Sequence, residues 1–420
     1  MTSTSCNELA EDLLARAIAG DAPDELPRAL ADEPCSRALF SILAEGLADR
    51  FEPALCDVYA RWFSQAIALV VEGADAAQLL ARYQRVRRVR AVAGEPARVF
   101  VLSRVTLGAD IAVTSVLLDA ARRRFPAAGI WFVGPAKNYE LFAADPRIGH
   151  APLAYRRGTL GERLAVRQEL SALLGAPNSL TIDSDSRLTQ LGLLPICPED
   201  SYRLFESRAY GGNGSESLSE LAARWAEETL GIVGARPYAA LVGPAEQTAD
   251  ITVSLGVGEN PAKRLPDPFE EELLRLLASR GASICIDKGA GGEEAARVEQ
   301  AVKRSGAQVT YWTGSFAGFA SIVAGSRLYV GYDSAGQHVA SAAGVPLISI
   351  FAGFPAARMF DRWRPRANGG AVLRMDPLVE RHCASGAASG YQTEAARSIA
   401  VGEEALEGVR RALAVLETAQ

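Results

Sequence analysis

The amino-acid sequence predicts an α/β protein in which two doubly wound, parallel-sheet domains follow an all-helical extension. Three observations lead to this prediction. Residues 1–95 carry apolar side chains at helical spacing with almost no strand signal. Compact apolar strands then alternate with amphipathic stretches from residue 98 to about 230, and again from 251 to 351. A chain of 420 residues is also too long for one ordinary core, which favours several packed domains.

The helical extension, residues 1–95, shows its periodicity in runs such as Leu9, Leu13 and Ala17. It contains no residue pattern that indicates catalysis. We therefore expect this extension to bind a protein partner or to mediate self-association.

The first α/β domain is predicted over residues 96–235. A strand at 99–103, an amphipathic helix from Ile111 to Arg124 and a second strand at 129–134 form a β-α-β unit, and a later strand is expected at 179–183. The glycine-rich loop 210–215 follows, and a helix from about 218 to 230 leads to a linker rich in glycine and proline.

The second α/β domain is predicted over residues 236–390, with a C-terminal helix in 391–420. Five strands alternate with helices in the pattern of a mostly parallel sheet; the strands are expected at 251–255, 283–286, 308–311, 328–331 and 347–351. Because ligands bind at the carboxyl ends of such strands, two domains of this kind are expected to face a common cleft.

Composition excludes some classes of function. The formal net charge of −6 gives no general attraction to nucleic acid or to anionic lipid. The first residues lack the basic and apolar regions of a signal peptide, and no segment reaches the ~20 apolar residues of a membrane helix, so a cytoplasmic protein is expected. The six cysteines show no Cys-x-x-Cys spacing and are expected to be reduced thiols.

The most informative segment is the turn from Asp333 to His338, which follows an apolar strand and opens a helix closed by Gly344. Ser334 can cap the helix, and Gly336 can let a ligand oxygen approach the backbone. Unpaired N–H groups at such a helix start can hold phosphate. His338 could bond a phosphate or a sugar hydroxyl, or pack on the sheet. A capped helix without any ligand has the same pattern.

Lys263 and Arg264 lie in a loop rich in glycine and proline, in a chain that has only four lysines. A lysine beside a diphosphate would neutralise the charge that grows on a leaving group. A solvated loop lysine is the alternative.

Asp110 follows Gly108 at the strand-to-helix turn of the first domain. Its carboxylate could accept the proton of an acceptor hydroxyl, or it could simply stabilise the start of the helix. Asp183 and Asp185 end a strand and could hold a divalent cation, but strand-end aspartates more often cap the next helix, so no metal is expected.

Several segments together resemble the ADP-heptose:lipopolysaccharide heptosyltransferases, glycosyltransferase family nine, over residues about 98 to 380. The segment 107–115 with 122–126 is similar to the family's Gly-Asp turn and its exit motif, and 253–256 with 263–266 is similar to its glycine-rich loop. The segment 332–346 is similar to the signature D-S-G-x-x-H-x-A-A-A-x-G-x-P, and 362–365 to a distal W-x-P element. This chain has Gly108-Ala109-Asp110 where the family has Gly-Asp, and Ala335 where it has glycine.

The resemblance implies a GT-B fold and an inverting, metal-independent transfer of a heptose-like unit from a nucleotide sugar, ADP-sugar foremost, to an acceptor hydroxyl, without a cofactor. Asp110 would be the base and Lys263 the diphosphate contact, with a donor-binding set of Lys263, Arg264, Asp333, Ser334, Ala335, Gly336 and His338. The acceptor would be a saccharide, a lipid-linked saccharide or a protein, and a lipid-linked one would place the protein at the inner membrane. The alternative is a non-catalytic protein of the same fold that binds sugar nucleotides or serves in an assembly.

Overall fold

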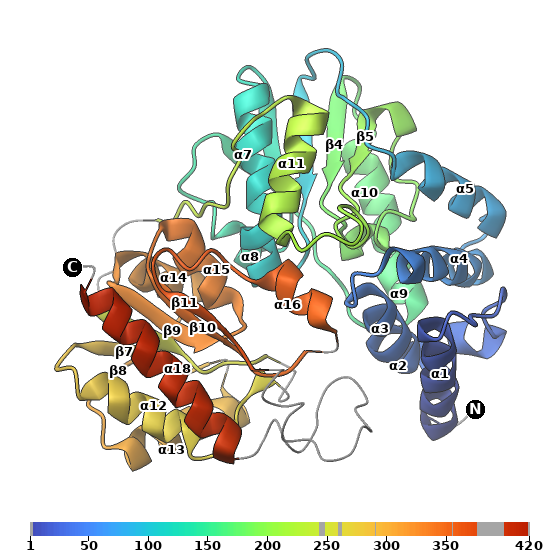
Figure 1. Cartoon of the computed structure of the whole chain (residues 1–420). Helices are drawn as coiled ribbons and strands as arrows, with labels where there is room; N and C mark the ends of the chain where they lie inside the picture. The colour runs from blue at the N-terminus through green and yellow to red at the C-terminus, as the bar shows by residue number, and fades with distance from the viewer. Residues whose placement is uncertain are drawn as a thin grey trace. The chain divides into compact units, whose positions relative to one another are not determined.

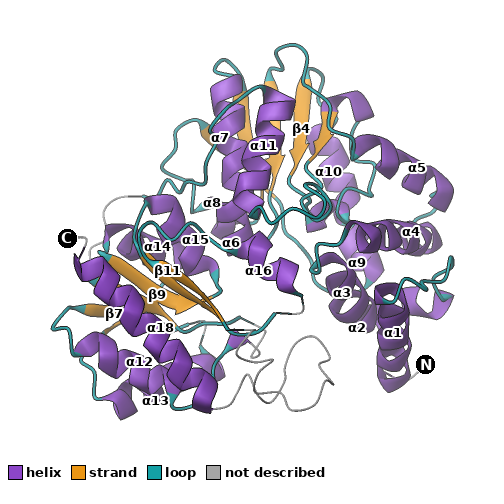
Figure 2. Ribbon diagram, in the orientation of Figure 1, coloured by secondary structure: helices purple, strands orange, loops and turns teal. Residues whose placement is uncertain are grey.

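A computed structural model describes residues 3–242, 248–258, 263–289, 291–354, 356–375 and 399–418. The chain divides into two compact units, Met1–Tyr139 with Pro146–Arg236 and Glu140–Asp145 with Pro237–Gln420 (Figure 1). Each unit contains one parallel sheet with helices packed on it (Figure 2). None of the described helices has the length and hydropathy needed to cross a bilayer.

The first unit begins with the predicted helical extension. Its helical elements, of which η3 is a π-helix, are α1 (Ser3–Ile18), η1 (Arg28–Ala31), η2 (Glu33–Cys35), α2 (Ser36–Ala38), η3 (Leu39–Ala44), α3 (Glu45–Ala48), α4 (Pro53–Val70) and α5 (Ala76–Val86). Buried side chains of this extension, such as Trp62 and Phe63, belong to the same hydrophobic core as Phe100, Leu102 and Leu188 of the α/β part. The extension and the first sheet therefore stabilise each other as one unit.

The first sheet has five parallel strands in the order β3-β2-β1-β4-β5. Its strands are β1 (Arg98–Leu102), β2 (Gly129–Gly134), β3 (Ile148–Pro152), β4 (Ser179–Asp183) and β5 (Tyr202–Leu204). Its helices are α6 (Leu107–Ala109), η4 (Asp110–Thr114), α7 (Ser115–Arg124), α8 (Ala136–Tyr139), α9 (Leu160–Leu164), α10 (Val166–Leu174), η5 (Arg187–Thr189), η6 (Glu199–Ser201) and α11 (Leu218–Leu230). The helices α7 and α11 lie side by side (Figure 2).

The second sheet has six parallel strands in the order β11-β10-β9-β6-β7-β8. Its strands are β6 (Ile251–Ser254), β7 (Ile284–Asp287), β8 (Thr310–Trp312), β9 (Leu328–Tyr332), β10 (Leu347–Phe351) and β11 (Ala371–Arg374). Its helices are α12 (Phe269–Ala278), α13 (Gly292–Ser305), α14 (Phe316–Gly325), α15 (Ala335–Ala343), α16 (Ala357–Trp363) and α18 (Ile399–Thr418). This order is that of a doubly wound parallel sheet, as predicted.

One prediction about the cysteines was wrong. Cys6 on α1 and Cys35 in η2 form a disulfide between segments that lie 29 residues apart in the sequence. Sequence spacing did not reveal the pair, because only the packing of the extension brings the two sulfurs together. Cys56, Cys197 and Cys285 are free thiols as expected, and Cys383 lies outside the described residues.

Candidate functional site

Each sheet reverses its strand order at one point, and ligands of doubly wound folds bind beside that point, at the carboxyl ends of the strands. In the first unit the reversal lies between β1 and β4, and in the second unit between β6 and β9. The predicted site residues follow these strands. Asp110 comes after β1, Lys263 after β6, and the turn from Asp333 to His338 after β9.

The predicted strand, turn and helix around Asp333 are confirmed. The strand β9 ends at Tyr332, Asp333 donates its backbone N–H to the Ile350 carbonyl at 3.2 Å, and α15 runs from Ala335 to Ala343. Gly344 closes the helix in the left-handed conformation, with φ of 77°. The first N–H groups of α15 thus lie at the edge of the sheet where a phosphate would bind.

Lys263 and Asp333 come together at this edge. The Lys263 Nζ donates to Asp333 Oδ2 at 2.7 Å, in an ion pair whose side chains are 19% and 9% exposed. The same nitrogen lies 3.4 Å from the Asp333 carbonyl oxygen. A lysine from one side of the reversal point is therefore held against the turn on the other side, as a diphosphate contact requires.

Arg264 does not join this pair. Its Nε donates to Glu270 Oε1 at 2.9 Å, and its Nη2 pairs with Asp267. Glu270 is buried and also binds Arg297. Arg264 is thus held by Glu270 of α12 and by Asp267, and its predicted part in donor binding stays a prediction.

Gln337 is a site residue that the sequence analysis missed. Its Nε2 donates to Asp333 Oδ1 at 2.6 Å, and Ser349 on β10 donates to its Oε1. Asp333 therefore has one carboxylate oxygen on Gln337 and the other on Lys263. The only sequence signal was an amide one helical turn after an aspartate, which is too common to be informative.

The predicted capping bond of Ser334 is absent, and Gly336 lies against a buried tyrosine. Ser334 stands at the N-cap of α15 but its side chain makes no capping hydrogen bond, and its Oγ lies 3.4 Å from the Tyr329 hydroxyl. A Cβ added at Gly336 would lie 2.4 Å from that same hydroxyl. Because Tyr329 is fully buried, packing against it requires glycine here, and the approach of a ligand oxygen to Gly336 stays a prediction.

His338 is buried beside Trp363 of the distal motif, with 5.8 Å between the ring centroids. Its Nε2 lies 3.3 Å from the Gln337 Nε2. Burial lowers the pKa of His338 to about 4, against the opposing effect of Asp333, while Lys263 lowers it further. The imidazole is therefore neutral at pH 7, and any bond to a phosphate is that of a neutral donor.

This pKa predicts a pH dependence of stability. Between pH 6.5 and pH 4 the unfolded chain binds a proton at His338 and the folded chain does not, so stability falls as the pH falls through this window. Urea unfolding at pH 7 and pH 5 should show that the wild type loses about 2 kcal/mol more than His338→Gln. The buried Glu206, whose pKa burial raises to about 7, contributes the opposite slope in both proteins and cancels in the comparison. Equal losses in the two proteins would contradict the prediction.

Asp110 is placed at the predicted turn, but its surroundings were not foreseen. The side chain is fully buried, and its carboxylate accepts four hydrogen bonds of 2.6 to 2.7 Å, from Ser103 Oγ, the Arg104 N–H, Thr114 Oγ1 and Asn138 Nδ2. Burial raises the pKa of Asp110, and the hydrogen bonds oppose that rise. Its role as a base stays a prediction, and the saturated carboxylate favours a structural role.

Relative to the heptosyltransferase motif, this chain has one additional residue, Ala109. The backbone conformation at Asp110 shows how the helix accommodates it. Asp110–Thr114 forms the π-helical segment η4 between α6 and α7. A π-helical turn accommodates one additional residue, so the helix can continue downstream without rotation of its buried face.

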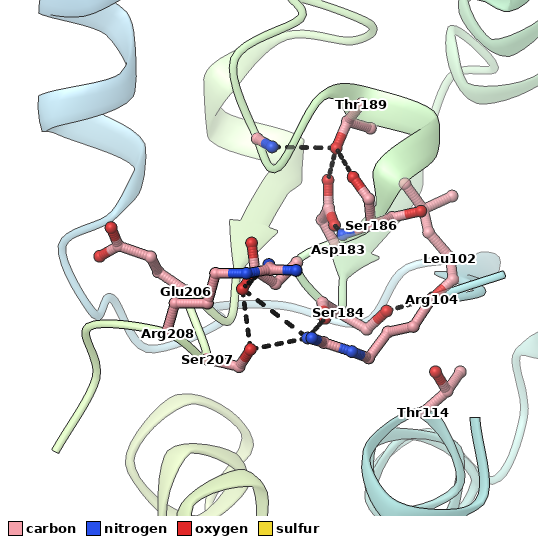
Figure 3. Close-up of polar contacts among 12 residues, drawn as sticks. Leu102, Arg104, Thr114, Asp183, Ser184, Ser186, Thr189, Glu206, Ser207 and Arg208 are labelled. Carbon is pink, nitrogen blue, oxygen red and sulfur yellow. Dashed lines mark hydrogen bonds and ion pairs between the residues drawn. The ribbon is translucent and has the colours of Figure 1, made fainter. Parts of the chain in front are cut away.

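A polar network missed by the sequence analysis lies at the same reversal point (Figure 3). Arg104 donates through Nη1 to the Ser184 carbonyl at 2.6 Å and to Ser207 Oγ at 2.7 Å. Asp185 accepts from Ser207 at 2.8 Å and lies 2.6 Å from Arg208 Nη1. These groups are almost fully buried. Burial, and then the neighbouring charge of Arg208, lower the pKa of Arg104 to about 10.

Asp183 does not cap the next helix as predicted, because Ser186 is the N-cap of η5; Asp183 instead binds the turn before it. It accepts from the Ser186 N–H at 2.7 Å, at the start of η5, and its other oxygen accepts from Thr189 at 2.6 Å and from Tyr202 at 2.5 Å. These bonds tie the end of β4 to the following turn and to β5.

Comparison with known proteins places the second-unit site in a family. Residues 245–375 match the sequence profile of glycosyltransferase family 9 (heptosyltransferase). The second unit carries a glycosyltransferase family 9 domain. The matched residues include Lys263, Asp333 and Gln337, whereas the motif around Asp110 lies outside them.

Solved structures share the fold over most of the chain. A glycosyl transferase family 9 protein from Veillonella parvula is 15% identical with a TM-score of 0.54, and covers 78% of this chain and 99% of its own. The ADP-heptose lps heptosyltransferase II of E. coli is 17% identical with a TM-score of 0.52, and covers 77% and 99%. The family 9 domain thus belongs to a GT-B fold. Among curated protein sequences, none matches the chain.

Proposed function

We propose that the protein is an inverting glycosyltransferase, which moves a heptose-like unit from a nucleoside diphosphate sugar to an acceptor hydroxyl. The observation that carries the proposal is the Lys263–Asp333 pair beside the N-terminus of α15, inside the family 9 domain. We take ADP-sugar as the first candidate donor, with no metal or cofactor, and a saccharide, a lipid-linked saccharide or a protein as the acceptor.

The chemistry assigned to this edge is stabilisation of a leaving diphosphate. The acceptor oxygen forms a bond to the anomeric carbon and gives its proton to a base, the role predicted for Asp110. The bond from that carbon to the diphosphate breaks, and its electron pair leaves with the phosphate oxygen. One direct displacement inverts the anomeric centre. Lys263 and the first N–H groups of α15 provide positive charge where negative charge grows.

Lys263 faces a carboxylate before any donor binds. Asp333 holds the ammonium group in place, and Gln337 fixes the second oxygen of that carboxylate. The lysine is thus oriented in advance, which lowers the entropy lost when a diphosphate binds.

The test is calorimetry with a panel of nucleoside diphosphates. One of them should bind in the micromolar range, and Lys263→Ala should weaken it by on the order of tenfold or more, because a charge-assisted contact is lost. Lys303→Ala, which removes an exposed lysine on α13, is the matched control and should bind like the wild type. Absence of binding across the whole panel would overturn the proposal.

The saturated carboxylate of Asp110 favours a second candidate, a non-catalytic protein of the same fold that binds a sugar nucleotide. Phosphorus and proton NMR of the bound nucleotide sugar, incubated with a panel of sugar acceptors, separate the two functions. Release of the nucleoside diphosphate together with a new glycosidic product of inverted configuration supports the transferase. Tight binding of the donor without any product supports the second candidate.

A further inference from the structure

A small pocket lies in the first unit, where the helical extension covers the carboxyl ends of the strands. The extension contributes Phe40, Glu45 and Tyr59 to its wall. The segments that follow β3, β4 and β5 contribute the remaining side chains, which include Tyr155, Arg163, Arg187, Gln190 and Arg208. The pocket is thus built jointly by the extension and by the sheet edge at which doubly wound folds bind ligands.

The charged groups of the wall are three guanidinium groups and one carboxylate. Arg187 lies 3.5 Å from Glu45, and both side chains are partly exposed. Arg163 donates from Nε to the Gly158 carbonyl at 3.1 Å and pairs with the Tyr155 hydroxyl. The wall therefore has an excess of positive charge in a protein whose net charge is −6.

Arg208 forms the buried end of this wall. It is 6% exposed, and its Nη1 forms an ion pair with Asp185 at 2.6 Å (Figure 3). Its Nε is buried and makes no hydrogen bond to the described part of the chain, whereas Nη1 is paired with Asp185. A buried Nε–H that lacks an acceptor costs free energy, which an anionic ligand in the pocket would recover.

The loop beside Arg187 has an unusual backbone. Gln190 and Leu191 both have positive φ, 49° and 57°, and Gly192 follows with 89°. Left-handed conformations in consecutive residues other than glycine cost free energy and persist where the surroundings demand them. Here they direct the Gln190 and Leu191 side chains to the wall of the pocket.

The open space is small. Its volume is about 30 Å³, which exceeds the roughly 10 to 15 Å³ that a site needs to hold one water molecule. The space therefore suits a small group.

From these observations we propose that the pocket is a binding site for one oxyanion group, a carboxylate or a phosphate, which Arg163, Arg187 and Arg208 bind. Guanidinium groups match the planar, bidentate geometry of such oxyanions. In this arrangement the helical extension supplies a ligand wall, in addition to any partner it binds. The site lies in the first unit and does not depend on the donor site around Lys263.

In the test, the full chain is titrated with inorganic phosphate at constant ionic strength. The rise of the thermal unfolding midpoint measures binding. Arg187→Gln should weaken phosphate binding by on the order of tenfold. Glu45→Gln should strengthen it severalfold, because it removes the carboxylate that competes for Arg187. Arg28→Gln, the control that removes an exposed arginine of the extension, should leave this binding unchanged.

Acetate and glucose 6-phosphate distinguish the forms of the ligand. Acetate binding that depends on Arg187 would assign carboxylates to the site, and glucose 6-phosphate binding with the same dependence would show that the group can be part of a larger ligand. Circular dichroism verifies that the variants are folded. Equal phosphate affinity in the wild type and Arg187→Gln, or weaker binding in Glu45→Gln, would overturn the proposal.

Discussion

Replacement of Asp110 by alanine is expected to lower the free energy of unfolding of the first unit by about 4 kcal/mol. The carboxylate is the common acceptor for four donors in a fully buried position. Alanine leaves these donors without an acceptor, and each buried unpaired donor costs about 1 to 3 kcal/mol before the hydroxyl groups reorient. Hydrogen exchange of the β1 amides in increasing urea reports the stability of this unit separately from the second.

The control for Asp110 is Thr114→Val, which removes one of the four donors and keeps the acceptor. It is expected to cost about 1 kcal/mol. If Asp110→Ala has nearly the stability of the wild type, the carboxylate does not anchor the turn. The variant Asp110→Asn tests the proposed base. Its hydrogen exchange at β1 and its donor binding at Lys263 must match the wild type, because a disrupted hydrogen-bond network would also abolish transfer.

Replacement of Asp185 by asparagine is the second large effect expected. The carboxylate faces two buried arginines, with Arg208 Nη1 at 2.6 Å and Arg104 Nη1 at 3.7 Å. Removing the charge of one partner leaves buried guanidinium groups uncompensated, which costs about 3 to 5 kcal/mol. Urea-dependent exchange at β4 is the measurement, because Asp185 lies directly after that strand.

Two further variants serve as controls for the Asp185 prediction. Asp200→Asn changes a fully exposed carboxylate near Arg90 and should alter stability by less than about 0.5 kcal/mol. Adding Arg208→Met to Asp185→Asn should restore part of the loss, since one of the unpaired charges is removed. A cost below about 1 kcal/mol for Asp185→Asn would show that solvent reaches the two arginines and that the network is not closed.

Patterns that act locally could be predicted from the sequence. The strand ending at Tyr332, the turn at Asp333 and the helix closed by Gly344 follow from apolar runs and from glycine at the helix end, and all three are present. The meeting of Lys263 with the Asp333 turn agrees with the expectation that residues after neighbouring parallel strands lie at one edge.

The contacts that sequence reasoning missed depend on distant segments. The disulfide of Cys6 requires the folded extension, and the role of Gln337 requires both Asp333 and Ser349 on another strand. The saturation of Asp110 depends on Asn138 from beyond β2. Arginine composition alone could not separate Arg208 from the many solvated arginines, because burial is a property of the fold.

The central claim is that Lys263 binds the diphosphate of a donor at the edge of the second sheet. The most direct measurement compares two ligands, the nucleoside diphosphate that binds best and the corresponding nucleoside, in the wild type and in Lys263→Ala. We predict that the variant loses affinity for the diphosphate by on the order of tenfold or more and keeps its affinity for the nucleoside. Equal losses for both ligands, or no loss for the diphosphate, would contradict the claim.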